Sequence, residues 1–441
     1  MKSNLPELTV IIPTRNRAVT LEAALRTCTA QNYDRLTILV SDNASTDNTL
    51  EVVRSFNDIR IRYVNTSKRM SMTRNWEFAL SHVVGGYVTF LGDDDGLIPN
   101  AASDIASLIQ ETGAQAISWN KAEYHWPSHP NFALRNVISI PAMNVLVEIP
   151  ATLALRHATR FWLPYNKLPT VYNSFVAYNV IASAKQKNGS FFMSVTPDVY
   201  SGFALMKVLN SYLYSSRPFS VNGASASSNG SNSISGSRLQ GESAQFMSEF
   251  DLEQNETFQV IPGAIYSSIA EALCQADKYC FNSRLSINKK LIIKLILRDI
   301  YLYLPEQRQH SLDALYKMVA RYGLKDFAEE RGNKVSNIKS IEKLPFEVSP
   351  RSVIQRGSLV FDAENFNVKD VFDACKLTGN LLPIYRQPSS IVRYSFLTLI
   401  FTFRCTDFGL YSELKEKSNL LLRLVKGQIA SFFSKYLKNK L

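Results

Sequence analysis

The sequence is poor in the residues that cross-link small domains or bind zinc. It has five cysteines and five histidines among 441 residues. The cysteines are scattered, odd in number and without metal-ligand spacing to any histidine, so neither a disulfide framework nor a zinc site is expected. The pattern is typical of reduced thiols, and we expect a cytoplasmic protein.

Glycine-rich phosphate loops and long apolar runs are also missing. A nucleotide-binding oxidoreductase needs a glycine-rich turn after its first strand, and a P-loop enzyme needs GxxxxGK[ST]. The letters PTRNR stand at that place instead. The N-terminus lacks the pattern of a signal peptide, and the apolar stretch 394–403 is shorter than the roughly 20 residues that cross a bilayer. We therefore do not expect a nucleotide-binding oxidoreductase, a P-loop enzyme, an exported protein or a membrane-spanning protein.

Positive charge is in excess, with 49 Lys and Arg against 38 Asp and Glu. Such a balance favours anionic partners, but no nucleic-acid module appears, so nucleic acid is not among the predicted partners. From Ser418 to Leu441 there are five basic residues and no acidic one. We interpret this stretch as a helix that packs on the rest of the chain. The alternative is a basic helix in peripheral contact with the inner face of a membrane.

The first third of the chain alternates between strand and helix patterns. The expected strands are 8–12, 36–40, 59–64, 87–91 and 116–119, with helices at 21–30, 48–56, 71–83 and 100–112. This alternation predicts an α/β fold, a Rossmann-like, mainly parallel sheet with helices on both faces.

A stretch rich in Gly, Ser and Asn, 222–237, predicts an irregular loop, either a mobile lid or a linker. Helical patterns follow at 261–280, 288–303, 312–322, 369–377 and 411–437. We therefore expect an α/β domain over 1–240 and a mostly helical C-terminal region of uncertain role over 241–441.

Three polar clusters, 13–17, 41–43 and 92–95, follow predicted strands directly. The carboxyl ends of parallel strands lie along one edge of a sheet, and ligands bind beyond that edge. Asp93, Asp94 and Asp95 repel one another, and Mg²⁺ or Mn²⁺ would relieve this repulsion and bind substrate phosphates. The alternative is a solvated acidic turn. Asp42 can accept a hydrogen bond from a nucleotide base, or simply shape a turn.

Together the segments TVIIPTRNR, VSDNASTDNT, KRMSMTRNWEFAL and FLGDDDGLIP resemble the family 2 glycosyltransferases of the GT-A fold. The resemblance is close from Leu8 to Ile117 and continues weakly to Ser237. It implies inverting transfer of a sugar from a nucleotide diphosphate, UDP in the first instance, to an acceptor hydroxyl in bacterial surface-glycan synthesis. The acceptor, a glycan, a lipid-linked molecule or a protein, is left open.

The resemblance also implies roles for particular residues. The donor is expected to contact Pro13, Thr14, Arg15, Asp42, Arg74, Asp93 and Asp94. A Mn²⁺ or Mg²⁺ ion is expected at Asp94 and Asp95, with Asp94 the stronger ligand. Asp198, in SVTPDVYSGFALM, resembles the acceptor-side segment of the family and is the predicted general base. The alternative is that Asp198 only caps a helix.

Two departures from the family pattern stand out. Arg15 occupies a place that is usually aromatic, and Gly92 stands where the acidic motif usually begins with Asp. Both keep a second function open, that of a catalytically inactive binding or scaffolding subunit.

Overall fold

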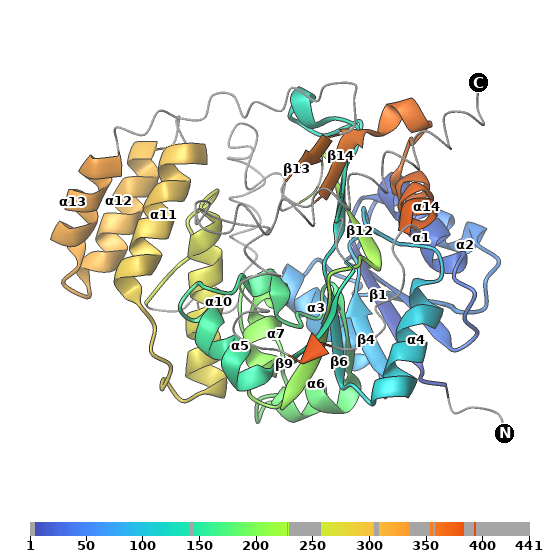
Figure 1. The fold of residues 1–441 in the computed structure, drawn as a ribbon, viewed down its shortest axis with the longest axis horizontal. Coiled ribbons are helices and arrows are strands. Elements are labelled where there is room, and N and C mark those ends of the chain that lie inside the picture. Colours follow the sequence, from blue (N-terminus) through green and yellow to red (C-terminus); the bar gives the residue numbers. More distant parts are fainter. Residues whose placement is uncertain are drawn as a thin grey trace.

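A computed structural model describes residues 5–141, 144–226, 228, 257–303, 308–335, 353–355, 358–382 and 392–393. Within these residues the largest element is a nine-stranded sheet in the order β15-β9-β11-β6-β10-β4-β1-β2-β3 (Figure 1). Its strands are β1 (Leu8–Thr14), β2 (Leu36–Asp42), β3 (Ile61–Asn65), β4 (Tyr87–Phe90), β6 (Ala116–Trp119), β9 (Leu146–Pro150), β10 (Ser174–Ala177), β11 (Ser211–Ser215) and β15 (Val392–Arg393).

The half of this sheet that comes first in the chain is parallel throughout. β1 pairs with β2 and β4, and β2 pairs with β3, all in parallel. Antiparallel pairing enters with β10, between β4 and β6, and again between β9 and β11. The predicted mainly parallel sheet is confirmed, with this mixed half added.

Helices cover both faces of the sheet, as predicted. They are α1 (Ala18–Thr29), α2 (Thr49–Ser55), α3 (Met72–Ser81), α4 (Ala101–Thr112), α5 (Ala151–Ala158), α6 (Tyr178–Ala184) and α7 (Pro197–Leu205). Successive strand residues point to opposite faces, so Val10 and Ile12 of β1 lie in a core with α1, α2 and α4. Ile11 between them lies in a second core with α3, α5, α6 and α7. Each face of β1 is therefore buried.

A smaller six-stranded sheet stands beside the first, in the order β13-β14-β8-β7-β12-β5. Its strands are β5 (Gly96–Leu97), β7 (Ala122–His125), β8 (Val137–Pro141), β12 (Ser220–Ala224), β13 (Val353–Gln355) and β14 (Ser358–Asp362). Residues 222–224 of β12 belong to the segment predicted as an irregular loop, so the prediction is wrong for these three residues. Pairing with β5 and β7 makes them a strand despite their low β-propensity.

The predicted helical region begins as expected, with a bundle of α10 (Ile265–Cys280), α11 (Lys289–Tyr303), α12 (Arg308–Ala320) and α13 (Lys325–Val335). Apolar side chains of these four helices form a third core, and α10 also packs on α7. The predicted stretch 411–437 and its basic C-terminal helix lie outside the described residues. None of the helices within the described residues is long and apolar enough to cross a membrane.

After the bundle, the chain packs again on its first part. The predicted, mostly helical C-terminal region therefore also contains strands. β14 pairs antiparallel with β8, and α14 (Val371–Leu381) packs against α1 (Figure 1). Phe361, Val371 and Cys375 are buried in the same core as α1 and α4. Arg26 of α1 forms an ion pair with Asp370, which caps α14, at 2.9 Å. The return brings together segments that no local pattern connects.

Candidate active site

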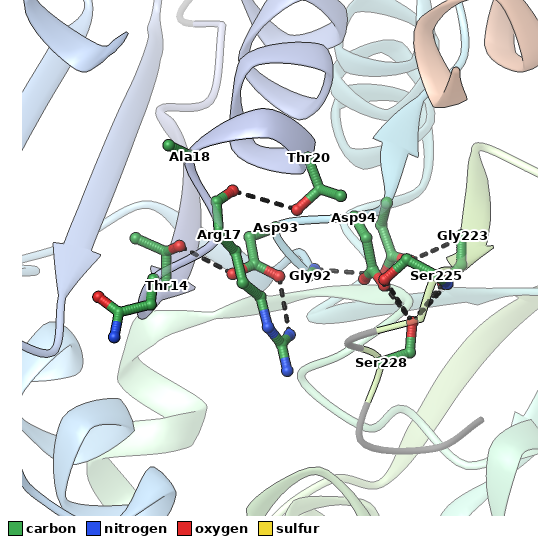
Figure 2. A network of polar contacts seen from close by, with 12 residues as sticks. Thr14, Arg17, Ala18, Thr20, Gly92, Asp93, Asp94, Gly223, Ser225 and Ser228 are labelled. Atoms are coloured by element: carbon green, nitrogen blue, oxygen red, sulfur yellow. Dashed lines mark hydrogen bonds and ion pairs between the residues drawn. The ribbon is translucent and has the colours of Figure 1, made fainter. Parts of the chain in front are cut away.

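Three aspartates follow β4 and lie at the carboxyl edge of the large sheet, as predicted. Asp93 faces the end of β1, where the Thr14 hydroxyl donates to Asp93 Oδ2 at 2.8 Å. Arg17, at the start of α1, donates to Asp93 Oδ1 at 3.0 Å. Figure 2 shows these three side chains converging from neighbouring segments. They meet because β1 and β4 are parallel neighbours that end at the same edge.

Asp94 points away from this group, toward the end of β12. The hydroxyls of Ser225, at 2.8 Å, and Ser228 both donate to Asp94 Oδ2 (Figure 2). Trp126 Nε1 donates to the carbonyl of Asp94 at 3.1 Å. A Cβ on Gly223 would stand 1.8 Å from that carbonyl oxygen, so only glycine allows β12 to approach so closely.

Asp95 turns inward and connects three segments. Its Oδ1 accepts the backbone N–H of Gly223 at 2.7 Å, and its Oδ2 accepts the backbone N–H of Gly92 at 3.2 Å. The hydroxyl of Tyr172 donates a further, short hydrogen bond to Oδ2. A Cβ on Gly92 would lie 2.7 Å from the Tyr172 hydroxyl. A side chain at position 92 would therefore force the side chains of Tyr172 and Asp95 to move, which the glycine of this chain avoids.

Burial shifts the pKa values of Asp93 and Asp95. Residues 93, 94 and 95 are at most 5% exposed. Burial, with a contribution from the charge of Asp94, raises the pKa of Asp95 to about 7. Burial also raises the pKa of Asp93, with Arg17 opposing and Asp94 adding to the rise. A cation bound beside them would favour their ionised forms.

The hydrogen bonds that these carboxylates accept leave Asp94 better able than Asp95 to bind a metal ion. Among the described residues, none donates a hydrogen bond to Asp94 Oδ1, whereas both oxygens of Asp95 accept hydrogen bonds from the protein. In the described part of the chain, no group of three or more His, Cys, Asp or Glu side chains is arranged to hold a metal. A metal here would therefore need oxygen ligands from a substrate, as Mg²⁺ commonly does.

Asp42 ends β2, beside Thr14 in the register of the sheet. Its Oδ1 accepts the backbone N–H of Ser45 at 2.9 Å, so it shapes the turn that follows. Its Oδ2 accepts the hydroxyl of Tyr63 at 2.5 Å and the amide Nδ2 of Asn65 at 3.0 Å. Asp42 is buried, with 2% of its surface exposed.

The other predicted donor residues lie along the same edge. Pro13 is the second-to-last residue of β1, and half-buried Arg15 directly follows the strand. Arg74 is exposed in the first turn of α3, where its backbone N–H donates to the Ser71 cap. The ion pair with Asp93 is made by Arg17, and the sequence pattern had not singled out Arg17 over Arg15.

Asp198 stands in the first turn of α7. Burial raises its pKa, and the N–H of Val199 and the charge of Lys121 oppose the rise. Burial and Asp95 raise the pKa of Tyr172, and the charge of Asp198 adds to this. Asp198 therefore lies within electrostatic reach of the tyrosine that bonds Asp95.

Four polar residues of this site had no signal in the sequence. Tyr172 belongs to no motif and reaches Asp95 from the segment before β10. Ser225 and Ser228 belong to a run of serines with no feature that distinguishes them. Tyr63 could be read only as an alternating strand residue.

This arrangement, a covered parallel sheet with polar side chains beyond the ends of β1, β2 and β4, defines an α/β protein whose ligand site lies at the carboxyl edge. Residues 9–166 match the model of the family described as Glycosyl transferase family 2. The resemblance drawn from the motifs is therefore confirmed for this part of the chain.

Two bacterial relatives illustrate the match. A GalNAc(5)-diNAcBac-PP-undecaprenol beta-1,3-glucosyltransferase of Campylobacter jejuni is 38% identical over 110 residues, 24% of this chain and 36% of the relative. The Escherichia coli UDP-Glc:alpha-D-GlcNAc-diphosphoundecaprenol beta-1,3-glucosyltransferase WfaP is 26% identical over 136 residues, 30% of this chain and 51% of the relative. The matches thus span only about a third to a half of each relative.

Among solved structures, S. aureus TarS 1-349 in complex with UDP-GlcNAc aligns with a TM-score of 0.43 and 14% identity, covering 80% of this chain and 95% of that one. The mannosyltransferase PcManGT of Pyrobaculum calidifontis, in complex with GDP-Man and Mn2+, aligns with a TM-score of 0.36 and 17% identity, covering 76% and 88%. Similarity at this level does not bear on the ligand of this chain.

Proposed function

We propose that the chain is an inverting glycosyltransferase that moves a sugar from a nucleotide diphosphate, a UDP-sugar, to a hydroxyl acceptor in bacterial surface-glycan synthesis. The observation that carries the proposal is the position of Asp93 and Asp94 at the carboxyl edge, beside Thr14, within the segment that matches the family. The two relatives are named for glucosyl transfer to undecaprenol-linked glycans. A lipid-linked glycan is accordingly the acceptor to test first.

The donor would lie along the edge formed by Pro13, Thr14, Arg15, Asp42 and Asp93. Asp42 would face the base, and Asp93, held by Arg17, would face the ribose. Arg74 would stand near the diphosphate and stabilise the charge that develops when the bond to the sugar breaks. A Mn²⁺ or Mg²⁺ ion at Asp94, with Asp95 as the second ligand, would neutralise the same charge when bound.

Asp198 would be the general base. It would take the proton of the acceptor hydroxyl while the hydroxyl oxygen forms its bond to the anomeric carbon. The bond between that carbon and the diphosphate oxygen breaks on the opposite side, which inverts the configuration. The raised pKa of Asp198 suits the role, because a base works best when its pKa approaches the working pH.

Thermal unfolding tests the donor site directly. The full chain is heated with UDP, GDP, ADP, CDP or TDP, each with and without Mn²⁺. A ligand that binds only the folded state raises the melting temperature, so we expect a metal-dependent rise with UDP. Asp94→Asn should lose the rise, whereas the matched control Asp313→Asn, on the exposed side of α12, should keep it.

The outcome also separates the two functions. Slow hydrolysis of a UDP-sugar together with the thermal shift supports an enzyme. A thermal shift without hydrolysis or transfer to any glycan acceptor would support an inactive binding subunit. No shift with any nucleotide would contradict the donor site itself.

A further inference from the structure

The base end of the proposed donor site contains two residues that no motif includes. Tyr63 and Asn65 stand two positions apart on β3, so their side chains point to the same face. β3 is the parallel neighbour of β2, and Asn65 is in register with Asp42. Both side chains contact the Asp42 carboxylate from that side.

Within the part of the chain that the structure describes, these contacts leave the carboxylate of Asp42 one free acceptor position. A carboxylate can accept about four hydrogen bonds, two at each oxygen. Tyr63 and Asn65 fill both positions on Oδ2, and the N–H of Ser45 fills one on Oδ1. A base can therefore form a single hydrogen bond with Asp42, at Oδ1.

The donors on Oδ2 are fixed in their roles. The N–H of Ser67 donates to Asn65 Oδ1 at 2.7 Å, which turns Nδ2 of the same amide toward Asp42. Asn65 Nδ2 also lies 3.1 Å from the Tyr63 hydroxyl oxygen, which accepts from it. Burial and the hydrogen bond to Asp42 raise the pKa of Tyr63, so its hydroxyl keeps its proton and donates.

The bases differ in how they meet such a carboxylate. Guanine offers two neighbouring donors, its ring N–H and its amine, and needs both carboxylate oxygens for a paired contact. Cytosine and adenine present an amine beside an acceptor ring nitrogen, which a carboxylate repels. Uracil offers one N–H between two carbonyls, so it can fill the single free position on Oδ1 without leaving a second donor unpaired.

From this geometry we infer that Tyr63 and Asn65 set the base specificity of the donor site, restricting Asp42 to one hydrogen bond and so selecting uridine over guanosine diphosphates. The inference rests on the proposed function, because it takes the carboxyl edge to be a nucleotide site. It concerns residues outside the three motifs of that edge.

Calorimetric titration of the full chain with UDP and with GDP, in the presence of Mg²⁺, tests the inference. We expect the native protein to bind UDP at least tenfold more tightly than GDP. Tyr63→Phe and Asn65→Ala each remove one donor from Oδ2, and the double variant removes both. The preference should fall in each single variant and by about tenfold in the double variant, mainly because GDP binds more tightly.

Tyr87→Phe is the matched control. Tyr87 is a half-buried tyrosine on β4 whose hydroxyl donates to the carbonyl of Ala114 at 3.0 Å, away from Asp42. Its loss should leave the ratio of the two affinities unchanged. Asn65 is exposed, so Asn65→Ala is expected to fold even where Tyr63→Phe lowers stability.

Two results would overturn the inference while the proposed function stands. One is a native protein that binds GDP as tightly as UDP, and the other is a preference for UDP that survives in all three variants. Failure of the native protein to bind either nucleotide would overturn the donor site itself, and the inference with it.

Discussion

The hydroxyl of Tyr172 donates to the carboxylate of Asp95, and these two groups occupy the space that a side chain on residue 92 would need. A Cβ on Gly92 would lie 2.7 Å from that hydroxyl and 2.8 Å from Asp95 Oδ2. The glycine, the tyrosine and the aspartate therefore form one packing unit beneath the donor edge. Each of the three constrains what the others can be.

Gly92→Ala is expected to destabilise the protein by about 1–3 kcal/mol, the usual cost of overpacking a buried site. Tyr172→Phe removes the hydroxyl that the new methyl group would meet. The double variant should therefore be more stable than the sum of the two single changes predicts. Urea unfolding of the four proteins measures this coupling. Additive losses would show that the methyl group does not meet the Tyr172 hydroxyl.

Asp198→Asn is expected to lower the rate of sugar transfer about 100-fold or more, the typical contribution of a general base. UDP affinity should stay unchanged, because the residue is assigned to the acceptor side. Initial rates with a lipid-linked acceptor and calorimetry with UDP check the two statements. Asp326→Asn, in the first turn of α13, is the matched control and should leave both values as they are. Equal transfer rates in the two variants would assign Asp198 to capping alone.

Asp299 predicts a pH dependence of stability in the helical bundle. It accepts the N–H of Tyr266 at 2.9 Å, and burial raises its pKa to about 6. The folded state therefore binds this proton more tightly than the unfolded state, whose pKa is near 3.8. The stabilisation is fully present below about pH 4 and is lost as the pH rises through about 6.

Asp299→Asn should remove this part of the pH dependence. The difference in unfolding free energy between native protein and variant, measured by urea unfolding from pH 4 to pH 8, should change across that window and be flat above it. A difference that is constant throughout would mean that Asp299 does not titrate in this range. Asp313→Asn, an exposed change on α12, serves as the reference.

A chain that ends at residue 345 should be much less stable than the full chain. It lacks β14 and α14, whose buried residues include Phe361 and Val371. The loss of β14 and α14 exposes apolar surface of β8 and α1. Each buried aromatic side chain that is removed lowers the unfolding free energy by about 3–5 kcal/mol. Urea unfolding, followed by the melting shift with UDP, measures the effect. Full retention of both would support the predicted division near residue 240.

Phe361→Ala in the full chain gives the same test without truncation. Phe361 is 4% exposed in the first core, and the change should lower the unfolding free energy by about 3–5 kcal/mol. Phe372→Ala, at a half-buried position on α14, should cost less.

The parallel half of the fold could be predicted because its signals are local. Apolar runs such as Leu36 to Val40 end abruptly at polar residues, and helical spacing fills the intervals. The same logic placed Thr14 and Asp93 on one edge. The smaller six-stranded sheet could not be predicted, because β5 has two residues and β12 is rich in small polar ones. Only their pairing makes them strands.

The side-chain partners of the site were less accessible still. Ser225 and Tyr172 reach the aspartates across more than 70 residues of sequence, and such contacts leave no periodic pattern. Arg15 and Arg17 are equivalent as letters, and only the start of α1 decides which one meets Asp93. The roles of Asp42, Arg74, Asp94, Asp95 and Asp198 in binding and catalysis stay predictions.

The pairing of β14 with β8 has a consequence for the ribosome. β8 leaves the exit tunnel about 200 residues before its partner strand is synthesised, and chains grow at about 5–20 residues per second. For some 10–40 seconds the nascent protein holds an unpaired strand edge and an uncovered apolar face. The six-stranded sheet can be completed only after residues 358–362 of β14 have been synthesised, so the chain needs protection from aggregation during its own translation.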